Sequence, residues 1–277
     1  MKIYNKTINK YLAAILFTSV LATACEKRLD VFPYQSIADD KALLSEGDVN
    51  VTLIGAYDGA QAATVYGGDI MVLNELIGNG ENINFTGTFA GLSDAFKAQM
   101  VANNGNALGT WTSSYSTINR INNVLSAVDK VTSSAAKKNS VEGQALFLRG
   151  SIYFELVRLF AKSVGDGDYA TNPGVPLVLT PTGNVTDADY KARATVKAVY
   201  DQVIADLVKA ESLLPSSNGI YATKWSAAAQ LSRVYLALKN YTEAGAAANR
   251  VITGSGKTLA TEIGKNWFTF INNGGTT

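Results

Sequence analysis

The chain has 277 residues, with 24 basic and 23 acidic side chains, one cysteine and no histidine. This near balance of charge argues against a nucleic-acid-binding surface, and a single cysteine excludes a disulfide within the chain. The lack of histidine excludes histidine metal sites and nucleophiles that a histidine activates, which leaves carboxylate catalysis of the glycosidase kind open. The length is sufficient for one large domain or two small ones.

The N-terminus has the features of a bacterial lipoprotein signal. Three lysines lie within the first ten residues, an apolar run follows at residues 11–21, and small residues come directly before Cys25. The apolar run is shorter than the roughly 20 residues that a transmembrane helix needs. We therefore expect a signal peptide over residues 1–24 and lipidation of Cys25, with palmitate among the acyl chains that anchor the protein. The alternative is an ordinary cleaved signal with an incidental cysteine.

A polar tether is expected over residues 25–44, and the main domain over residues 45–277. Ser45 and Asp48 are three residues apart and form a capping signal for the first helix. The apolar positions of this helix recur at helical spacing, at Val49, Leu53, Ala56 and Ala60. We expect these four side chains to share one buried face.

Residues 65–109 interrupt the helical pattern. They are rich in Gly, Asn, Thr and Phe and contain only short periodic pieces. We predict a long loop region there, with one or two short helices.

Two long helices are predicted next. The stripe of the first helix is Trp111, Tyr115, Ile118, Asn122 and Leu125, and that of the second is Val141, Ala145, Leu148, Ile152, Leu156 and Leu159. The amides of Asn119, Asn122 and Asn123 are expected to be buried and to form hydrogen bonds between helices.

The rest of the chain alternates irregular and helical segments. Residues 164–194 are irregular and contain the extended piece GVPLVL. Thr195 is the expected N-cap of the following helix, and Pro215 lies just past its end. Two shorter helices come after it, with the break between them expected at Lys239 and Asn240.

The pattern of small and large residues predicts paired helices. The last two helices match the spacing of a tetratricopeptide repeat, at Leu231, Ser232, Tyr235, Asn240, Tyr241 and Ala244. In such a repeat a small residue lets two helices approach, and an aromatic three residues later fills the space above it. Gly150 and Tyr153 repeat the arrangement. We predict an all-α fold of tetratricopeptide-like hairpins in an α-α superhelix with long irregular loops, against the alternative of an unrelated helical bundle.

Several segments in this order resemble the N-terminal half of the SusD/RagB family of outer-membrane nutrient-binding lipoproteins. They are the cysteine followed by LDVFP, LIGAYDG, WTSSYSTINRINNVL, EGQALFLRGSIYFELVRLFA with GVPLVL, RATVKAVYDQVIADLVKAESLLP, and WSAAAQLSRVYLALKNYTEA. Together they cover nearly the whole chain after the signal. Family members run to roughly twice this length, so the C-terminal half of the family is expected to be missing here, and the chain is expected to be either a fragment or a short variant.

The resemblance implies a lipid-anchored protein on the outer face of the outer membrane of a Gram-negative bacterium. Its expected partners are a TonB-dependent SusC-like transporter, an oligosaccharide or other nutrient, and the membrane itself, with no nucleic acid. No enzymatic activity and no cofactor are expected. The alternative is a tetratricopeptide-like scaffold that binds only protein partners and has no ligand site of its own.

Sugar sites pair an aromatic platform with amide, carboxylate or guanidinium groups. The region before the first long helix has this composition, and its candidate ligand-binding residues are Asn74, Glu75, Asn79, Phe85, Phe89 and Trp111. The alternative for the aromatic candidates is that they pack the loop onto the helices. No metal site is predicted, because the Gly-rich turn with Asp166, Asp168 and Asn172 lacks the distal glutamate of a calcium loop.

Overall fold

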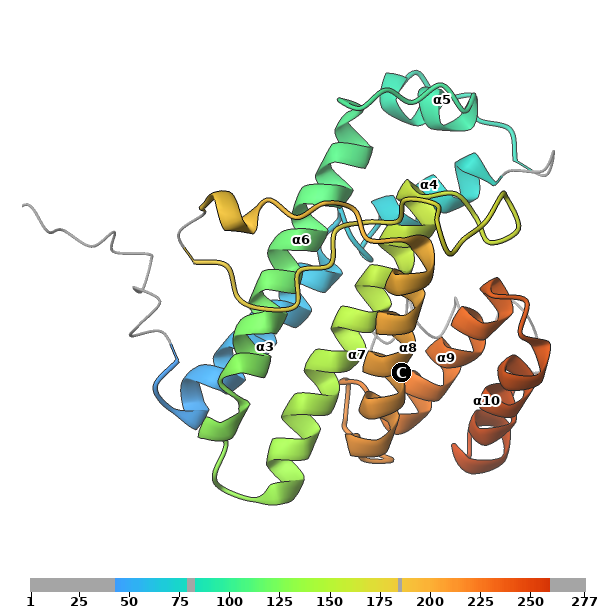
Figure 1. Ribbon diagram of the computed structural model, residues 1–277. Helices are drawn as coiled ribbons and strands as arrows, with labels where there is room; N and C mark the ends of the chain where they lie inside the picture. Colours follow the sequence, from blue (N-terminus) through green and yellow to red (C-terminus); the bar gives the residue numbers. More distant parts are fainter. Residues whose placement is uncertain (1–42, 79–82, 184–185, 260–277) are drawn as a thin grey trace, which may run out of the picture. The chain divides into compact units, whose positions relative to one another are not determined.

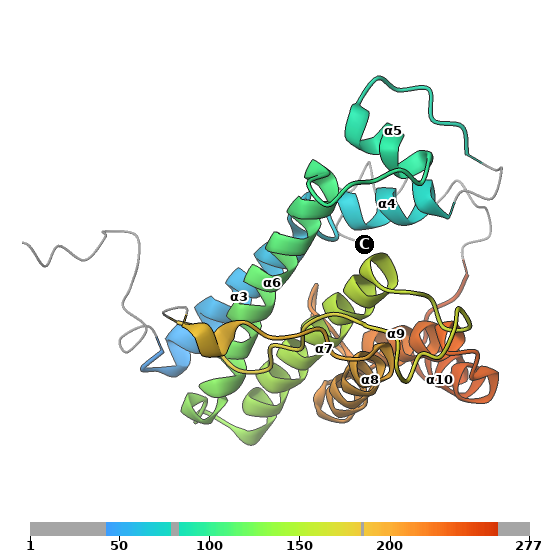
Figure 2. The same ribbon diagram turned by 45° about the horizontal axis from the view of Figure 1, so that its top comes forward.

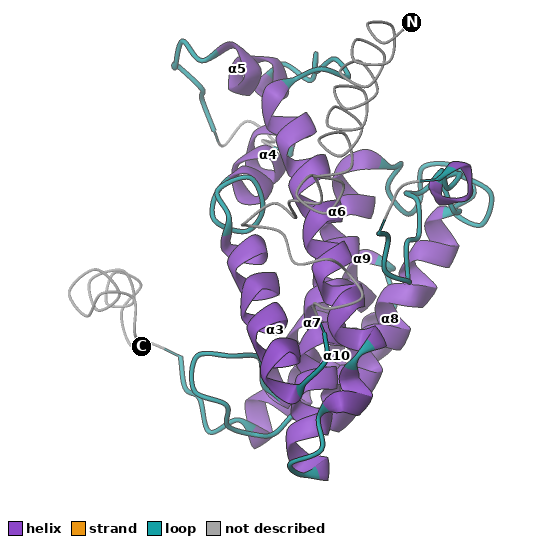
Figure 3. Ribbon diagram, turned by 90° about the vertical axis from the view of Figure 1, so that its left-hand side faces the viewer, coloured by secondary structure: helices purple, strands orange, loops and turns teal. Residues whose placement is uncertain are grey.

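The computed structural model describes residues 43–78, 83–183 and 186–259, which belong to one compact unit beginning at Leu43. The predicted signal peptide, Cys25 and Asn79 lie outside these residues. The described ranges contain helices and loops but no strand (Figures 1 and 3). The α-helices are α3 (Glu46–Gln61), α4 (Asp69–Ile77), α5 (Ala90–Phe96), α6 (Gly105–Ser126), α7 (Ala135–Phe160), α8 (Val196–Leu213), α9 (Lys224–Ala237) and α10 (Tyr241–Gly254).

Consecutive long helices pack side by side. Helix α3 lies against α6, α6 against α7, and α7, α8, α9 and α10 follow in order (Figures 1 and 2). A core of buried residues runs through this array and includes the predicted stripe of α3 and most of that of α7. From the predicted α6 stripe it includes Ile118, while Trp111, Tyr115 and Leu125 are partly buried against it. Leu159 of α7 packs instead on a smaller cluster around Leu73. The prediction of an all-α, tetratricopeptide-like fold is confirmed.

Several helices begin and end where local signals predict, but α6 begins at Gly105, inside the predicted loop region 65–109, because Asn104 caps it there. The Asp48 backbone N–H donates to Ser45 Oγ at 3.3 Å, and the Ser45 N–H donates to the Asp48 carboxylate at 2.9 Å. Thr195 accepts from the Ala198 N–H at 3.1 Å and caps α8. Lys239 has a positive φ of 59°, which ends α9 directly before Asn240 caps α10.

Small residues allow the close helix contacts that the repeat pattern predicts. A Cβ on Gly150 would lie 3.0 Å from Leu207 Cγ, so α7 and α8 meet at this glycine. Tyr153, one turn further along α7, is completely buried. In the next pair, the Ser232 hydroxyl donates to the carbonyl of Ala244 at 2.9 Å and joins α9 to α10.

An extended segment, residues 174–182, is held across α6 and α7 by side chains of these helices. Tyr115 Oη donates to the Pro176 carbonyl at 2.8 Å. Asn122 Nδ2 donates to the carbonyls of Val178 and Thr180 at 2.9 and 3.1 Å. Asn119 exchanges two hydrogen bonds with the Thr182 backbone, at 3.0 and 2.8 Å.

The expectation that the asparagines bond between helices therefore needs correction. Asn119 is only half-buried, and its partners lie in the irregular segment. Asn122 is buried and bonds mainly to the same segment, although its Oδ1 also accepts from Arg149 of α7 at 3.0 Å. Asn123 forms no side-chain hydrogen bond to another described residue. The cause is that an extended backbone leaves its N–H and C=O groups without ladder partners, and nearby amides can pair with both.

Among the described residues, none of the helices combines the length and the apolar composition that crossing a bilayer would require.

Candidate ligand-binding site

The region from α4 to α6 holds five described candidates from the sequence. Two short helices, α4 and α5, occur in it as predicted. They enclose a small apolar cluster around Leu73, Leu76 and Ala95. The Phe85 ring packs on the edge of this cluster, 6.4 Å from the Phe96 ring between centroids. Phe89 precedes α5 and is 63% exposed.

The polar candidates lie on α4. Glu75 is exposed. Asn74 is half-buried, and its Nδ2 donates to the Ile70 carbonyl at 2.8 Å and to Glu155 Oε2 at 3.3 Å. Glu155 is 1% exposed and also accepts from Arg158 at 2.7 Å. The structure thus places Asn74 beside the buried Glu155 carboxylate, which its amide helps to satisfy.

Trp111 points into an aromatic cluster. Its ring centroid lies 4.9 Å from that of Tyr115 and 5.0 Å from that of Phe160. It also lines a pocket of about 440 Å³ whose other residues are all apolar, namely Met100, Val101, Ala102, Ala107, Leu108, Leu159 and Phe160. The indole N–H is the one polar side-chain group in this pocket, so the pocket suits an apolar occupant better than a sugar.

The described candidates therefore do not converge on one cavity. Trp111 and Phe85 are partly buried against apolar neighbours, Asn74 faces Glu155, and Phe89 and Glu75 face solvent. Of these side chains, only the exposed Phe89 ring presents a free aromatic face, as a sugar platform requires.

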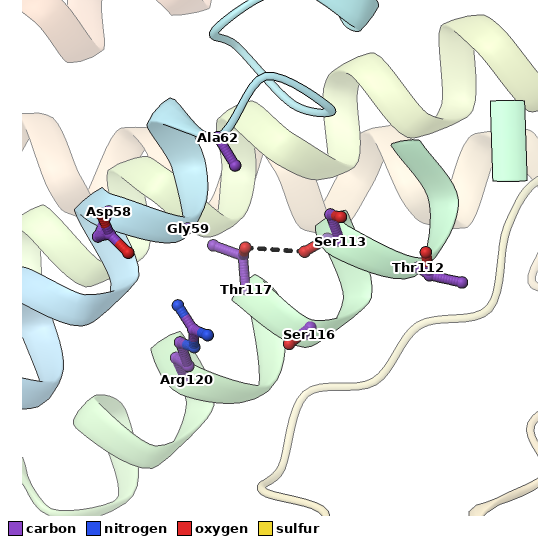
Figure 4. Close-up of a pocket in the computed structure, with 8 residues that line it drawn as sticks. All are labelled: Asp58, Gly59, Ala62, Thr112, Ser113, Ser116, Thr117 and Arg120. Carbon is purple, nitrogen blue, oxygen red and sulfur yellow. Dashed lines mark hydrogen bonds between the residues drawn. The ribbon is translucent and has the colours of Figure 1, made fainter. Parts of the chain in front are cut away.

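A different surface combines aromatic and polar groups. Figure 4 shows the residues that line a pocket between α3 and α6. The volume of this pocket is about 370 Å³. Its lining residues are Asp58, Gly59, Ala62, Thr112, Ser113, Ser116, Thr117 and Arg120. A Cβ on Gly59 would lie 2.5 Å from Thr117 Oγ1, so the two helices approach closely only because this residue is glycine. Arg120 Nη1 donates to the Gly55 carbonyl at 3.0 Å, which holds the guanidinium over the pocket.

A second pocket, of about 420 Å³, adjoins the first through Asp58. It is lined by Ile54, Tyr57, Asp58, Ala60, Gln61, Tyr66, Ile220 and Tyr221. The rings of Tyr57 and Tyr221 pack at 5.0 Å between centroids. Burial raises the pKa of Tyr57 to about 12. Its hydroxyl therefore stays protonated at neutral pH, and because it accepts from the Ala222 N–H at 3.1 Å, its own hydrogen is directed elsewhere.

We call these two pockets together the α3 groove. It offers an aromatic pair, a carboxylate, a guanidinium, an amide and a row of hydroxyls, which is the set of groups that binds the C–H faces and hydroxyls of a sugar. Sequence reasoning missed this surface because its residues come from three distant segments, 54–66, 112–120 and 220–221. The sequence signal that could have revealed it is the run of hydroxyl-bearing residues in TWTSSYST, at positions 110–117 of α6. This run lies beside the apolar stripe of the same helix.

Comparison with known proteins gives consistent matches. The family model SusD-like, described as "Starch-binding associating with outer membrane", matches residues 27–236. Two SusD-like proteins of Formosa agariphila, P2 and P38, are each 25% identical to this chain over 252 and 258 residues. These alignments cover 90% and 91% of this chain and 47% of each relative. The chain thus spans about half the length of the curated relatives it matches.

Solved structures share the fold. A SusD superfamily protein from Bacteroides thetaiotaomicron has a TM-score of 0.69 and 27% identity, over 82% of this chain and 50% of that one. A putative sugar binding protein from Bacteroides vulgatus has a TM-score of 0.67 and 27% identity, over 78% of this chain and 47% of that one. A laminarin-binding SusD-like protein, 20% identical over 81% of this chain and 48% of its own, has the same fold with a TM-score of 0.63.

Proposed function

This chain belongs to the SusD-like family of starch-binding proteins that associate with the outer membrane, and from this premise we propose that it is a non-catalytic, cell-surface protein that binds an oligosaccharide or other nutrient. We further propose that it delivers this ligand to a TonB-dependent SusC-like transporter. The similarity to a putative sugar binding protein supports a carbohydrate ligand.

The observation that carries ligand binding on this chain is the α3 groove. Asp58 is exposed and borders both of its pockets, so one carboxylate can accept from sugar hydroxyls on either side. Tyr221, 37% exposed, offers a partly open ring next to it. The region of Phe89, which the sequence analysis favoured, remains a second proposed surface.

We expect Asp58→Ala to weaken oligosaccharide binding by at least about tenfold, because hydrogen bonds to a charged group are among the stronger polar contacts. The melting temperature should not change, because Asp58 is exposed and its one side-chain partner among the described residues is Gln61, at 3.4 Å. Calorimetric titration with maltoheptaose and laminarihexaose measures the affinity, and thermal melting followed by circular dichroism measures the stability.

Asp201→Ala is the matched control, because Asp201 is also an exposed helical aspartate and lies on α8, outside the groove. Unchanged affinity in Asp58→Ala together with weakened binding in Phe89→Ala would place the site in the loop before α5 instead. A protein that binds no oligosaccharide but co-purifies with its transporter would support the alternative of a scaffold for protein partners only.

Membrane association is proposed to depend on the lipid on Cys25. We expect Cys25→Ser to move the protein from the detergent phase to the aqueous phase in detergent partitioning, since acyl chains supply the anchor. The folded domain begins at Leu43, so its melting temperature should remain unchanged. A serine variant that still enters the detergent phase would contradict the lipoprotein assignment.

A further inference from the structure

A pocket separate from the α3 groove lies among the last three described helices. It has a volume of about 590 Å³, within the range of about 300–1,000 Å³ that small-molecule sites occupy. Figures 1 and 2 show α8, α9 and α10 packed together at this end of the array. The lining residues are Val208, Glu211 and Ser212 of α8, Lys224 and Trp225 of α9, and Arg250, Thr253 and Gly254 of α10.

An indole and an ammonium group form one side of this pocket. Lys224 Nζ lies 4.3 Å from the centroid of the half-buried Trp225 ring. A Cβ on Gly254 would lie 2.4 Å from the Trp225 ring. The indole can therefore pack against α10 only because residue 254 is a glycine. Among the described residues, no carboxylate pairs with the Lys224 ammonium. Its positive charge is therefore available to a ligand in the pocket.

An ion pair between α8 and α10 forms the other side. Arg250 Nε and Nη2 donate to the two carboxylate oxygens of Glu211 at 2.7 and 2.8 Å. This bidentate contact fixes both planar groups and leaves Arg250 Nη1 without a hydrogen bond to another described residue. Its charges cancel, so Lys224 gives the pocket a net charge of one positive unit.

The hydroxyls at the rim are oriented as acceptors. Ser212 Oγ donates to the Lys209 carbonyl at 2.7 Å, and Thr253 Oγ1 donates to the Asn249 carbonyl at 2.8 Å. Because each hydroxyl hydrogen is engaged with its own helix, the lone pairs of both oxygens are available to hydroxyl groups of a ligand.

We propose that this pocket binds a uronic acid residue of an acidic oligosaccharide. A uronate has one carboxylate for Lys224 and Arg250 Nη1, hydroxyls for Ser212 and Thr253, and C–H groups for the part of the half-buried Trp225 indole that the Lys224 ammonium does not cover. The single positive charge matches a single carboxylate. A neutral sugar would leave the Lys224 charge unused, and an acidic peptide would lack the ring hydroxyls that the acceptors at the rim require.

This inference rests on the proposed function for its ligand class, since it assumes that the protein binds carbohydrate. It goes further in naming the charge of the sugar and in assigning it to α8, α9 and α10. The family model matches residues 27–236, so α10, which contributes one wall of the pocket, lies outside the matched residues.

The test is a nuclear magnetic resonance titration of the full chain with trigalacturonate and, separately, with maltotriose. The indole N–H signal of Trp225 is assigned by its loss in Trp225→Phe. We expect trigalacturonate to shift this signal saturably and maltotriose to leave it in place. Lys224→Gln should weaken trigalacturonate binding by at least about tenfold, and high salt should weaken binding to the wild type, because the attraction is between charges.

Lys97→Gln is the matched control, because Lys97 is exposed at the end of α5, and it should bind trigalacturonate like the wild type. The inference is overturned if trigalacturonate leaves the Trp225 signal unmoved, if maltotriose moves it equally, or if Lys224→Gln binds as well as the wild type. Maltoheptaose binding that is still sensitive to Asp58→Ala would then leave the proposed function standing, whereas loss of all sugar binding would remove both.

Discussion

Arg149→Met is expected to lower the free energy of unfolding by about 3–5 kcal/mol, because it leaves a buried carboxylate without its cation. Arg149 and Asp206 have side chains that are 9% and 3% exposed. The guanidinium donates to both carboxylate oxygens, at 2.7 and 2.8 Å, and joins α7 to α8. Urea denaturation, with the slope compared between variants, measures the loss.

Two further variants identify the cause. Arg149→Met combined with Asp206→Leu should recover most of the lost stability, because an apolar pair of similar volume removes the uncompensated charge. Lys197→Met breaks the exposed pair with Asp201 on the same helix and should change stability little. If the double variant is no more stable than Arg149→Met, the loss comes from packing and hydrogen bonds rather than from the isolated Asp206 charge.

Tyr153→Ala is expected to cost about 3–5 kcal/mol, as large-to-small changes of buried aromatics do. The ring is 0% exposed. The hydroxyl donates to the Val178 carbonyl at 2.9 Å and accepts from the Val178 N–H at 2.7 Å, so it also joins α7 to the extended segment. Burial raises the pKa of Tyr153 to about 12, which keeps the hydroxyl protonated for this exchange at neutral pH.

Tyr153→Phe separates the two contributions. It keeps the ring and removes the hydroxyl, and it should cost about 1–3 kcal/mol because the Val178 groups lose their partner. Tyr241→Ala is the exposed control: this ring is 68% exposed, and its removal should have little effect on the unfolding midpoint. Equal losses in Tyr153→Ala and Tyr241→Ala would contradict the assignment of Tyr153 as a buried core residue that joins α7 to α6 and to the extended segment.

The helices and their pairing could be predicted from the sequence because their signals are local. A cap such as Ser45 with Asp48, or Thr195 with the Ala198 N–H, depends on residues three positions apart. The buried stripes follow from the helical period alone. Gly150 and Tyr153 are one turn apart on the same helix. The close contact of Gly150 with α8 is therefore indicated by a short sequence pattern, a small residue followed three positions later by an aromatic one.

For the candidate site, the sequence could predict the types of side chain but not where in the fold they come together. Trp111 is on the expected stripe, but whether its ring faces a ligand or the core depends on Phe160, 49 positions further on and at the end of another helix. No spacing rule connects Asp58 with Arg120, which lines one pocket with it, or with Tyr221, which lines the other, because these pockets form only after α3, α6 and the turn before α9 have packed. The sequence therefore predicted an aromatic and polar sugar site, while the structure favours a different location for it.

The helical class, the caps at Ser45 and Thr195 and the resemblance to the SusD-like family could all be recognised in the chain alone, since each depends on neighbours along one helix or on the order of segments. The partners of Asn122, the burial of the Arg149–Asp206 pair and the composition of the α3 groove became visible only in the packed structure. Asn122 shows the reason: its amide bonds to carbonyls 56 and 58 positions away, on a segment whose backbone has no ladder partners. Such contacts depend on which surfaces meet after the helices pack. Helical periodicity relates residues only a few positions apart, so it carries no information about partners more than fifty positions away.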